Sequence, residues 1–282
     1  MMKIIESPRE GMQGFSRIIP TREKVRYINQ LLRVGFDTVE IGSIVSPQLI
    51  PQMADSLDVL NSLDLAGTTT NLMFLCVNNR GADLLAGRDE ITHISYPFSF
   101  SPAFLKLNVN TTVQKSFDTA EYVINLCHAK GKQAVIYISM AFGNPYGDPW
   151  NLDILVESVS KLYQAGVRII PLSNVSMEIE PELISKVFSS LIPFFPDVEF
   201  GLHLHTSNQG WREKTAAAYD AGCRRFDGVI NGMGGCPMAG KELLGNLKTE
   251  NLVEFTGMGK LWKEFNFERF KDALVLADEV LK

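Results

Sequence analysis

The chain has 282 residues, of which 45% are hydrophobic and 21% are charged, and its formal net charge is −5. This balance is typical of a globular protein, and the length suits one α/β barrel. The sequence has no long basic run, which argues against nucleic acid as a partner. No apolar run approaches the roughly 18 residues that a membrane span needs, so we expect no membrane association.

Cysteine usage and the first residues bear on the compartment. The four cysteines are Cys76, Cys127, Cys223 and Cys236, and no two of them form a C-x-x-C pair. The amino-terminal residues contain no apolar signal segment and no arginine-rich presequence. We therefore expect reduced thiols in a cytoplasmic protein rather than a disulfide framework.

Short β-branched or apolar runs alternate with longer helical patterns along the chain. The eight predicted strands are residues 3–5, 38–41, 70–76, 91–95, 133–139, 168–172, 199–205 and 225–230. Repeated β-α units predict a parallel sheet covered by helices, and eight units in this length favour a closed (β/α)8 TIM barrel. No G-x-G-x-x-G follows the first strand, which argues against an open dinucleotide-binding sheet.

Helical periodicity is clearest in residues 21–34 and 112–130 and in the segment that starts at Pro181. The residues after Leu252 predict further helices. We expect one catalytic domain over residues 1–282, with additional closing helices at about 252–282.

Two of the four histidines, His203 and His205, lie two residues apart in the predicted strand 199–205. Side chains alternate along a strand, so both imidazoles are expected on one face. Two adjacent imidazoles can begin a site for a borderline divalent cation, or they can simply occupy the wet face of a half-buried strand. Catalytic groups of such barrels lie at the carboxyl ends of the strands, and this position favours metal ligands.

Other chemical groups follow predicted strands. Arg9 and Glu10 come just after the first strand, and a carboxylate with two imidazoles is a recognisable metal set. The alternative is a surface Arg/Glu pair in a loop. Glu40 ends the second strand, where it either orients Arg9 or a ligand or serves as a structural partner for the backbone.

The segment after the eighth strand is rich in glycine, with three glycines in the four residues 232–235. Glycines permit unusual backbone angles and a close approach to a substrate. Cys236 in this turn is a candidate acid/base, because a nearby metal or cation can bring the pKa of a thiol toward neutrality. A small residue filling a turn is the alternative. Asn246 offers an amide oxygen as a fourth ligand, whereas His93 and His128 are expected to be structural.

Together these segments resemble the 3-hydroxy-3-methylglutaryl-CoA lyase family of metal-dependent barrel lyases, to which isopropylmalate and citramalate synthases are related. The resemblance runs from about Glu6 to Glu250. Its most specific parts are Pro8-Arg-Glu-Gly-Met-Gln13, Val45-Ser-Pro-Gln-Leu-Ile-Pro-Gln-Met53, Asn144-Pro-Tyr146, His203-Leu-His205, and Gly234-Gly-Cys-Pro237 with Gly245-Asn246. The stretch 45–53 resembles the lyases more than the synthases.

The resemblance implies retro-Claisen cleavage of a 3-hydroxyacyl-CoA to acetyl-CoA and a keto acid by a homodimer. It also implies a divalent cation, first Mg²⁺ or Mn²⁺ and alternatively Zn²⁺ or Co²⁺. Arg9 would stabilise the developing enolate, Cys236 would move a proton, and Glu40 matches the acid of the second strand. The implied metal ligands are Glu10, His203, His205 and Asn246.

Several positions depart from the family pattern. Glu10 stands where the family has aspartate, and its extra methylene moves the carboxylate by about 1.5 Å. Asn174 and Thr206 also replace aspartates, and the segment from Cys236 to Asn246 is one residue longer, with Lys241 and Glu242 in place of small residues. These departures leave three alternatives open: a related aldolase or condensing enzyme acting on a different hydroxy acid, a weak catalyst, or an inactive ligand-binding homologue.

Overall fold

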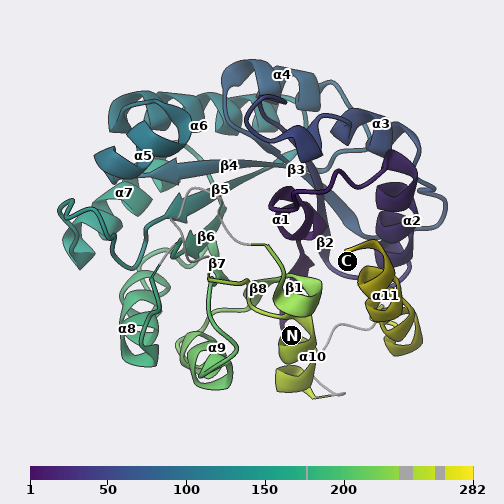
Figure 1. Ribbon diagram of the computed structural model, residues 1–282. Helices are drawn as coiled ribbons and strands as arrows, with labels where there is room; N and C mark the ends of the chain where they lie inside the picture. Colours follow the sequence, from purple (N-terminus) through teal and green to yellow (C-terminus); the bar gives the residue numbers. More distant parts are fainter. Residues whose placement is uncertain (176, 235–243, 258–263, 282) are drawn as a thin grey trace.

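The computed structural model describes residues 1–175, 177–234, 244–257 and 264–281 (Figure 1). Eight parallel strands form one closed barrel in which each strand pairs with the next and β8 pairs with β1. The strands are β1 (Lys3–Glu6), β2 (Thr38–Ile44), β3 (Asn71–Cys76), β4 (His93–Ser99), β5 (Gln133–Ser139), β6 (Ile169–Ser173), β7 (Glu199–His203) and β8 (Arg225–Gly228). The predicted TIM barrel is confirmed.

In Figure 1 the helices surround the strands, and the last helix, α11, lies beside α2. The α-helices are α1 (Pro8–Gln13), α2 (Thr21–Leu32), α3 (Ser56–Asn61), α4 (Asn79–Ala86), α5 (Pro102–Val109), α6 (Val113–Ala129), α7 (Leu152–Gln164), α8 (Pro181–Leu191), α9 (Trp211–Asp220), α10 (Thr249–Thr256) and α11 (Phe267–Val280). Two 3-10 turns, η1 (Pro51–Met53) and η2 (Ile230–Gly232), follow β2 and β8. No described helix is long and apolar enough to cross a membrane.

The strand residues alternate between two cores, as period two requires. Ile5, Met73 and Val135 form a small cluster with Tyr137, separate from the main core. The neighbouring residues Ile4, Phe74 and Ile136, like Phe200, Leu202 and Leu204 of the seventh unit, belong to the main core. This agrees with the expectation that the apolar residues around the two histidines face away from them.

The carboxyl ends of β7 and β8 differ from the prediction. β7 ends at His203, and His205 instead forms an isolated antiparallel bridge with Asn246. β8 ends at Gly228, because the chain turns into η2, where the Glu6 carboxylate accepts the Ile230 N–H at 3.1 Å. Both strands are therefore shortened at the end where the chemistry lies.

The segment that follows β1 is a short helix and not a surface loop, which was the alternative reading. Pro8 occupies its first turn, where a missing N–H costs nothing and the fixed φ suits a helix. Helix α1 carries Arg9 and Glu10, and both side chains are buried. The alternative of a surface Arg/Glu pair is therefore wrong.

The closing helices α10 and α11 confirm the expected carboxyl-terminal helices. Asn266 caps α11 by accepting the Arg269 N–H. Phe36 packs edge-on against Phe265 and Phe270, with ring centroids 5.6 and 6.2 Å apart. These aromatic contacts attach the end of the chain to the segment between α2 and β2.

Candidate functional site

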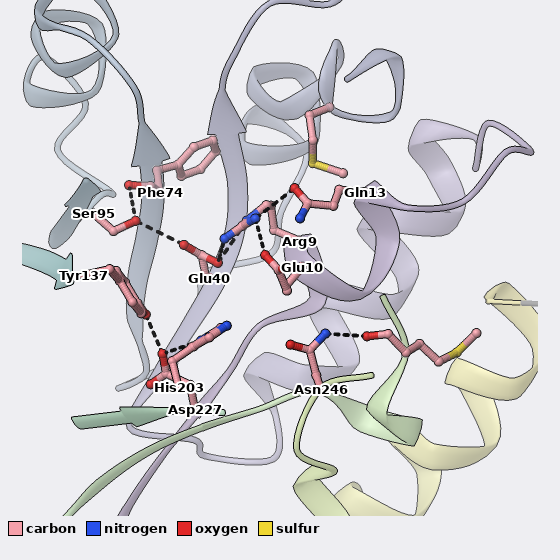
Figure 2. Close-up of polar contacts among 12 residues, drawn as sticks. Arg9, Glu10, Gln13, Glu40, Phe74, Ser95, Tyr137, His203, Asp227 and Asn246 are labelled. Carbon is pink, nitrogen blue, oxygen red and sulfur yellow. Dashed lines mark hydrogen bonds and ion pairs between the residues drawn. The ribbon is translucent and has the colours of Figure 1, made fainter. Parts of the chain in front are cut away.

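Arg9 lies between two carboxylates at the mouth of the barrel (Figure 2). Its Nε and one terminal nitrogen donate to Oε2 of Glu40 at 3.0 and 2.5 Å, and its other terminal nitrogen donates to Oε2 of Glu10 at 2.5 Å. The same nitrogen reaches Gln13, one helical turn further along α1, at 2.9 Å. Ser95 of β4 donates to the second oxygen of Glu40 at 3.1 Å. Glu40 therefore orients Arg9, which was one of the two roles expected for it.

The charges of this group are coupled. Burial tends to raise the pKa of both carboxyl groups, but Arg9 and the two nearby histidines leave the pKa of Glu10 below its ordinary value. The pKa of Glu40 remains raised, because burial and the charge of Glu10 outweigh the effect of Arg9. Burial lowers and the two carboxylates raise the pKa of Arg9, with a net rise, so the guanidinium stays charged. The ionised form of Glu10 is thus favoured beside the charged guanidinium of Arg9.

His203 is oriented by a carboxylate from the neighbouring strand. Its Nδ1 donates to Oδ2 of Asp227 at 3.0 Å, and the Tyr137 hydroxyl donates to the same oxygen at 2.6 Å. The rings of Tyr137 and His203 meet edge-on with centroids 5.5 Å apart. A carboxylate on Nδ1 fixes the tautomer and leaves Nε2 with its lone pair, which is the usual arrangement of a metal-binding histidine.

His205 is held through its backbone rather than through its ring. The Asn174 amide, directly after β6, accepts the His205 N–H at 2.7 Å and donates to the His205 carbonyl at 2.7 Å. It also donates to the carbonyl of Met177 at 2.6 Å. An aspartate accepts hydrogen bonds but cannot donate to these carbonyls when ionised. The asparagine is therefore a structural clamp on His205.

Thr206 has also acquired a defined set of partners. Its hydroxyl donates to Glu178 at 3.0 Å and accepts from Lys214 at 2.9 Å. Glu178 also accepts the Ser207 N–H at 2.6 Å and forms an ion pair with Lys214. The family resemblance expects a carboxylate at residue 206. In this protein Glu178 supplies a carboxylate that is hydrogen-bonded to Thr206 instead.

The described residues contain one set of donors suited to a metal ion, formed by Glu10, His203 and His205. One donor atom from each lies within 4.8 Å of the others, so the three side chains are near enough to face one cation. Nδ1 of His205 is buried and accepts no hydrogen bond from any described residue. Burial and the neighbouring His203 lower the pKa of His205 to about 3, so this imidazole is neutral and available as a ligand. The residues therefore fit a divalent cation.

Asn246 lies beside His205, because the two residues form an isolated antiparallel bridge. Its N–H donates to the Gly232 carbonyl at 3.0 Å, and its side-chain NH2 donates to the Met233 carbonyl at 2.7 Å, so Oδ1 is the side-chain atom that could coordinate a cation (Figure 2). Gly234, with φ +82°, comes so close to Glu10 that an added Cβ would lie 2.3 Å from the Glu10 carbonyl oxygen. Gly234 therefore packs closely against the backbone of Glu10.

The remaining residues considered in the sequence are Cys236, His93 and His128. Cys236 lies outside the described residues, so its role stays a prediction. His93 begins β4 and is largely buried, with Nδ1 2.8 Å from the Thr92 hydroxyl, and His128 lies on the exposed side of α6 near its end. Neither belongs to the metal-suited set, in agreement with a structural role.

A cavity of about 190 Å³ joins these groups at the carboxyl ends of the strands. Its polar lining includes Arg9, Glu10, Tyr137, His203 and His205. Apolar side chains, among them Leu75, Phe104 and Val175, complete the wall. A small cavity lined by the Arg9 guanidinium, the Glu10 carboxylate and two imidazoles can bind a polar ligand. Arg9 can stabilise negative charge that develops on that ligand.

Tyr137 and Asp227 belong to the site but were not singled out in the sequence. Asp227 alternates with Arg225 along β8, and this pattern places both on the same face of the strand. Two charged residues on one face of a predicted barrel strand were a signal that could have revealed them. The register that pairs His203 with Asp227 was not available from the sequence.

The protein is therefore a (β/α)8 barrel with a candidate metal site at the carboxyl ends of its strands. More narrowly, the chain belongs to the HMGL-like family, whose model matches residues 2–276. This confirms the resemblance seen in the sequence.

Individual relatives agree with the family assignment. The chain is 31% identical over 262 residues to mitochondrial hydroxymethylglutaryl-CoA lyase of Rattus norvegicus, covering 92% of this chain and 79% of the relative. It is 28% identical over 268 residues to (R)-citramalyl-CoA lyase of Chloroflexus aurantiacus, covering 90% and 82%. The solved structure of HMG-CoA lyase from Bacillus subtilis matches with a TM-score of 0.91 at 26% identity, over 99% of this chain and 93% of that chain.

Proposed function

We propose that the protein is a metal-dependent carbon–carbon lyase that cleaves a 3-hydroxyacyl-CoA to acetyl-CoA and a keto acid. The observation that carries the proposal is the convergence of Glu10, His203 and His205 on one point beside the fixed charge of Arg9. Membership of a family whose named relatives are hydroxymethylglutaryl-CoA and citramalyl-CoA lyases supports the same reaction class.

The proposed metal ligands are Glu10, His203, His205 and Asn246. One carboxylate, one amide oxygen and two imidazoles suit Mg²⁺ or Mn²⁺ through the oxygens, and Zn²⁺ or Co²⁺ through the nitrogens. When bound, the cation supplies a Lewis acid for the substrate hydroxyl and a substrate carboxylate. The protein's own contribution is to hold these donors rigidly, through Asp227 on His203 and through Asn174 on His205.

The proposed reaction breaks the bond between the hydroxyl-bearing carbon and the carbon next to the thioester. Cys236 is assigned the role of taking the hydroxyl proton; the hydroxyl-bearing carbon becomes the carbonyl of the keto acid, and the bonding electron pair becomes the enolate of acetyl-CoA. Arg9 holds the negative charge that develops on the thioester oxygen, and Glu40 keeps the guanidinium in place. Proton transfer that completes acetyl-CoA is assigned to Cys236.

The direct test combines the purified protein with Mg²⁺ or Mn²⁺ and hydroxymethylglutaryl-CoA and follows acetoacetate. Citramalyl-CoA is the second substrate, with pyruvate as the product followed. Turnover that requires the cation and disappears in His203→Ala supports the proposal. Absence of turnover with both thioesters and all four candidate ions overturns the specific assignment.

A second candidate is a ligand-binding homologue without catalysis, and one observation favours it. The Asn174 amide is committed to the His205 backbone, so no carboxylate stands at that position to accept a proton. Native mass spectrometry separates the two readings. A protein that binds no cation until Glu10→Asp is introduced would favour the non-catalytic homologue, whereas a cation bound by the unaltered chain supports the lyase. Condensation in reverse is tested with acetyl-CoA and a panel of α-keto acids.

We further propose a cytoplasmic homodimer whose partners are small molecules rather than nucleic acid or membrane. The described cysteines Cys76, Cys127 and Cys223 are free and buried, as reduced thiols would be. Light scattering coupled to gel filtration tests the dimer, and cell fractionation tests the compartment.

A further inference from the structure

A buried arginine lies inside the barrel, beneath the candidate metal site. Arg225 is only 1% exposed and precedes Asp227 by two residues on β8, so the two side chains share one face of the strand. Phe226 between them belongs to the main core outside the barrel. Asp227 in turn accepts the Nδ1–H of His203 at 3.0 Å (Figure 2). Arg225 therefore stands behind the carboxylate that orients a proposed metal ligand.

The neighbouring strand leaves room for this arginine. Gly201 of β7 pairs with Arg225 in the register of the two strands. A Cβ at residue 201 would lie 3.0 Å from Cδ and 3.1 Å from Cγ of Arg225, which is closer than ordinary van der Waals contact. Gly201 is not among the glycines with a positive φ, so its backbone conformation does not require glycine. The space occupied by the arginine stem does require it.

The lower end of the guanidinium is fixed by an ion pair. Nη1 of Arg225 donates to Oε1 of Glu199 at 3.2 Å, and Oε2 of Glu199 accepts from Lys3 at 2.5 Å. Burial lowers the pKa of Arg225, but the nearby charges, that of Asp227 foremost, raise it further, so the guanidinium stays charged. A buried cation of this kind requires carboxylate partners.

The upper end of the guanidinium faces Asp227. Nε of Arg225 lies 3.9 Å from Oδ1 of Asp227. Oδ2 of Asp227 accepts hydrogen bonds from His203 and Tyr137, whereas Oδ1 has no hydrogen-bond partner among the described residues. Opposite charges at this distance attract strongly in a buried environment even without a direct hydrogen bond. One oxygen of Asp227 thus serves the site, and the other faces the arginine.

This division between the two oxygens limits the rotation of the carboxylate. Rotation of Asp227 would move Oδ2 away from His203 and Oδ1 away from Arg225 at the same time. The attraction to Arg225 therefore opposes the loss of the hydrogen bond to His203. Residues that orient a metal-binding histidine in this way influence metal affinity, because they fix both the ring and its tautomer.

We propose that Arg225 is a positioning residue of the metal site, which holds Asp227 so that His203 presents Nε2 to a divalent cation. The proposal rests on the proposed function, because it takes His203 to be a metal ligand. Arg225 acts through Asp227 and contacts neither the cation nor the substrate. A row of charged and polar groups then connects the amino-terminal end of the barrel with its mouth: Lys3, Glu199, Arg225, Asp227 and His203.

The test measures Mn²⁺ affinity by electron paramagnetic resonance. Arg225→Met removes the charge but keeps much of the apolar stem, and the affinity should fall by about tenfold, the lower end of the range for loss of a supporting residue. Arg225→Lys keeps a cation and should recover part of this loss. Arg224→Met is the matched control, because Arg224 is the exposed neighbour on the opposite face and lies over the ring of Tyr219. It should bind Mn²⁺ normally.

A double-mutant cycle shows whether Arg225 acts through Asp227. Asp227→Asn alone should lower Mn²⁺ affinity by about 10- to 100-fold, and Arg225→Met should cause little further loss in that background. Two losses that multiply in full would show that Arg225 acts independently of Asp227, and would overturn the inference.

The proton on Nδ1 of His203 gives a second readout, which a general loss of stability would not move. In the metal-free protein this proton, held against Asp227, should give an NMR resonance downfield of the backbone amides that is absent from His203→Ala. The resonance should weaken in Arg225→Met and persist in Arg224→Met. Gly201→Ala crowds the arginine without removing its charge and should cause a smaller change of the same kind. This variant keeps the inference testable if Arg225→Met does not fold.

His203→Ala separates failure of the inference from failure of the proposed function. If His203→Ala loses Mn²⁺ but the Arg225 and Gly201 variants keep both the affinity and the resonance, the inference is overturned and the proposed function stands. If His203→Ala binds Mn²⁺ like the unaltered protein, the proposed metal site fails and the inference fails with it.

Discussion

The arginine side of the site and the histidine side are held together by different interactions. Arg9, Glu10 and Glu40 come from the first two β-α units and hold one another through ion pairs of their side chains. His203 and His205 come from the seventh unit and are held by neutral and charged hydrogen bonds from residues outside the metal-suited set. Ion pairs hold the arginine side in place, and directed hydrogen bonds hold the histidine side in place.

This difference explains which substitutions each side tolerates. On the charged side, Glu10 keeps a carboxylate within reach of the histidines although its side chain is one carbon longer than the resemblance expects. On the histidine side, Asn174 replaces a carboxylate and becomes a clamp that an ionised aspartate could not provide. Changes to Arg9 or Glu40 should therefore act on catalysis, whereas changes to Glu10 or to the histidine side should act on metal binding.

The largest effect is expected from removal of either imidazole. His203→Ala or His205→Ala removes one of the proposed ligands, so the affinity for Mn²⁺ should fall by more than the 10- to 100-fold typical of losing a supporting residue. Electron paramagnetic resonance of free Mn²⁺ measures this loss. His128→Ala, on the exposed side of α6, is the control and should bind Mn²⁺ normally. Unchanged affinity in both imidazole variants would exclude the proposed site.

Arg9→Met should separate catalysis from metal binding. The variant loses the cation that holds the enolate charge, so kcat should fall by about 100- to 1,000-fold. Mn²⁺ affinity should be kept, because Glu10 is released from its ion pair and remains an anion. Steady-state kinetics and metal titration on the same preparation test both statements. Arg22→Met removes an exposed arginine, 93% accessible, as the control.

Asn174→Asp should weaken the histidine side without raising turnover. The His205 carbonyl would lose its donor and face a carboxylate, so Mn²⁺ affinity should fall by about 10- to 100-fold. The free energy of unfolding should fall by roughly 1–3 kcal/mol, because buried carbonyls lose their partner. Urea denaturation and metal titration measure the two effects. A gain in turnover would show that the family's carboxylate is catalytic here and that the clamp is dispensable.

The smallest effect on the site is expected from Glu6→Gln, which acts on stability. Burial raises the pKa of Glu6 from 4.5 to about 8, outweighing the hydrogen bonds from Thr249 and Ile230. Between these values the folded protein keeps a proton that the unfolded chain loses, so the stability of the unaltered protein should fall as pH rises through this window.

The glutamine variant lacks this dependence, and the difference should reach the order of a few kcal/mol by pH 8. Urea denaturation at pH 5, 6.5 and 8 measures it. Glu121→Gln, on the exposed surface of α6, controls for the loss of one carboxylate. Parallel pH profiles for the unaltered protein and Glu6→Gln would show that Glu6 titrates normally in the folded state.

The barrel was predictable because its strands have a strong local signature. β-branched and apolar runs such as those of β3 and β5 specify a buried strand by themselves, and eight of them in this length leave little choice of fold. The ends of β7 and β8 were less predictable. Their last residues hydrogen-bond to the distant segment 245–248, and no local pattern contains that pairing.

The candidate site was predictable in the charged and imidazole side chains that follow strands, Arg9 and Glu40 among them, but not in the residues that support them. His203, His205 and Glu10 were visible because imidazole and carboxylate side chains follow strands whose carboxyl ends meet. Asn174 was seen only as a missing carboxylate, because its partner is 31 residues away in the sequence and is a backbone group. Asp227 was overlooked because its importance depends on the register between β7 and β8.

Asn246, a proposed metal ligand, is held in place independently of the glycine-rich segment that precedes it. The Asn246 N–H donates to the Gly232 carbonyl, the Leu247 N–H to that of Leu204, and the Thr206 N–H to that of Gly245. The entry and exit of the glycine-rich segment are thereby joined at its base. A change in the number of residues between these two ends would therefore leave the Asn246 backbone in its place. Variation in substrate preference thus becomes compatible with constancy of the metal-binding chemistry.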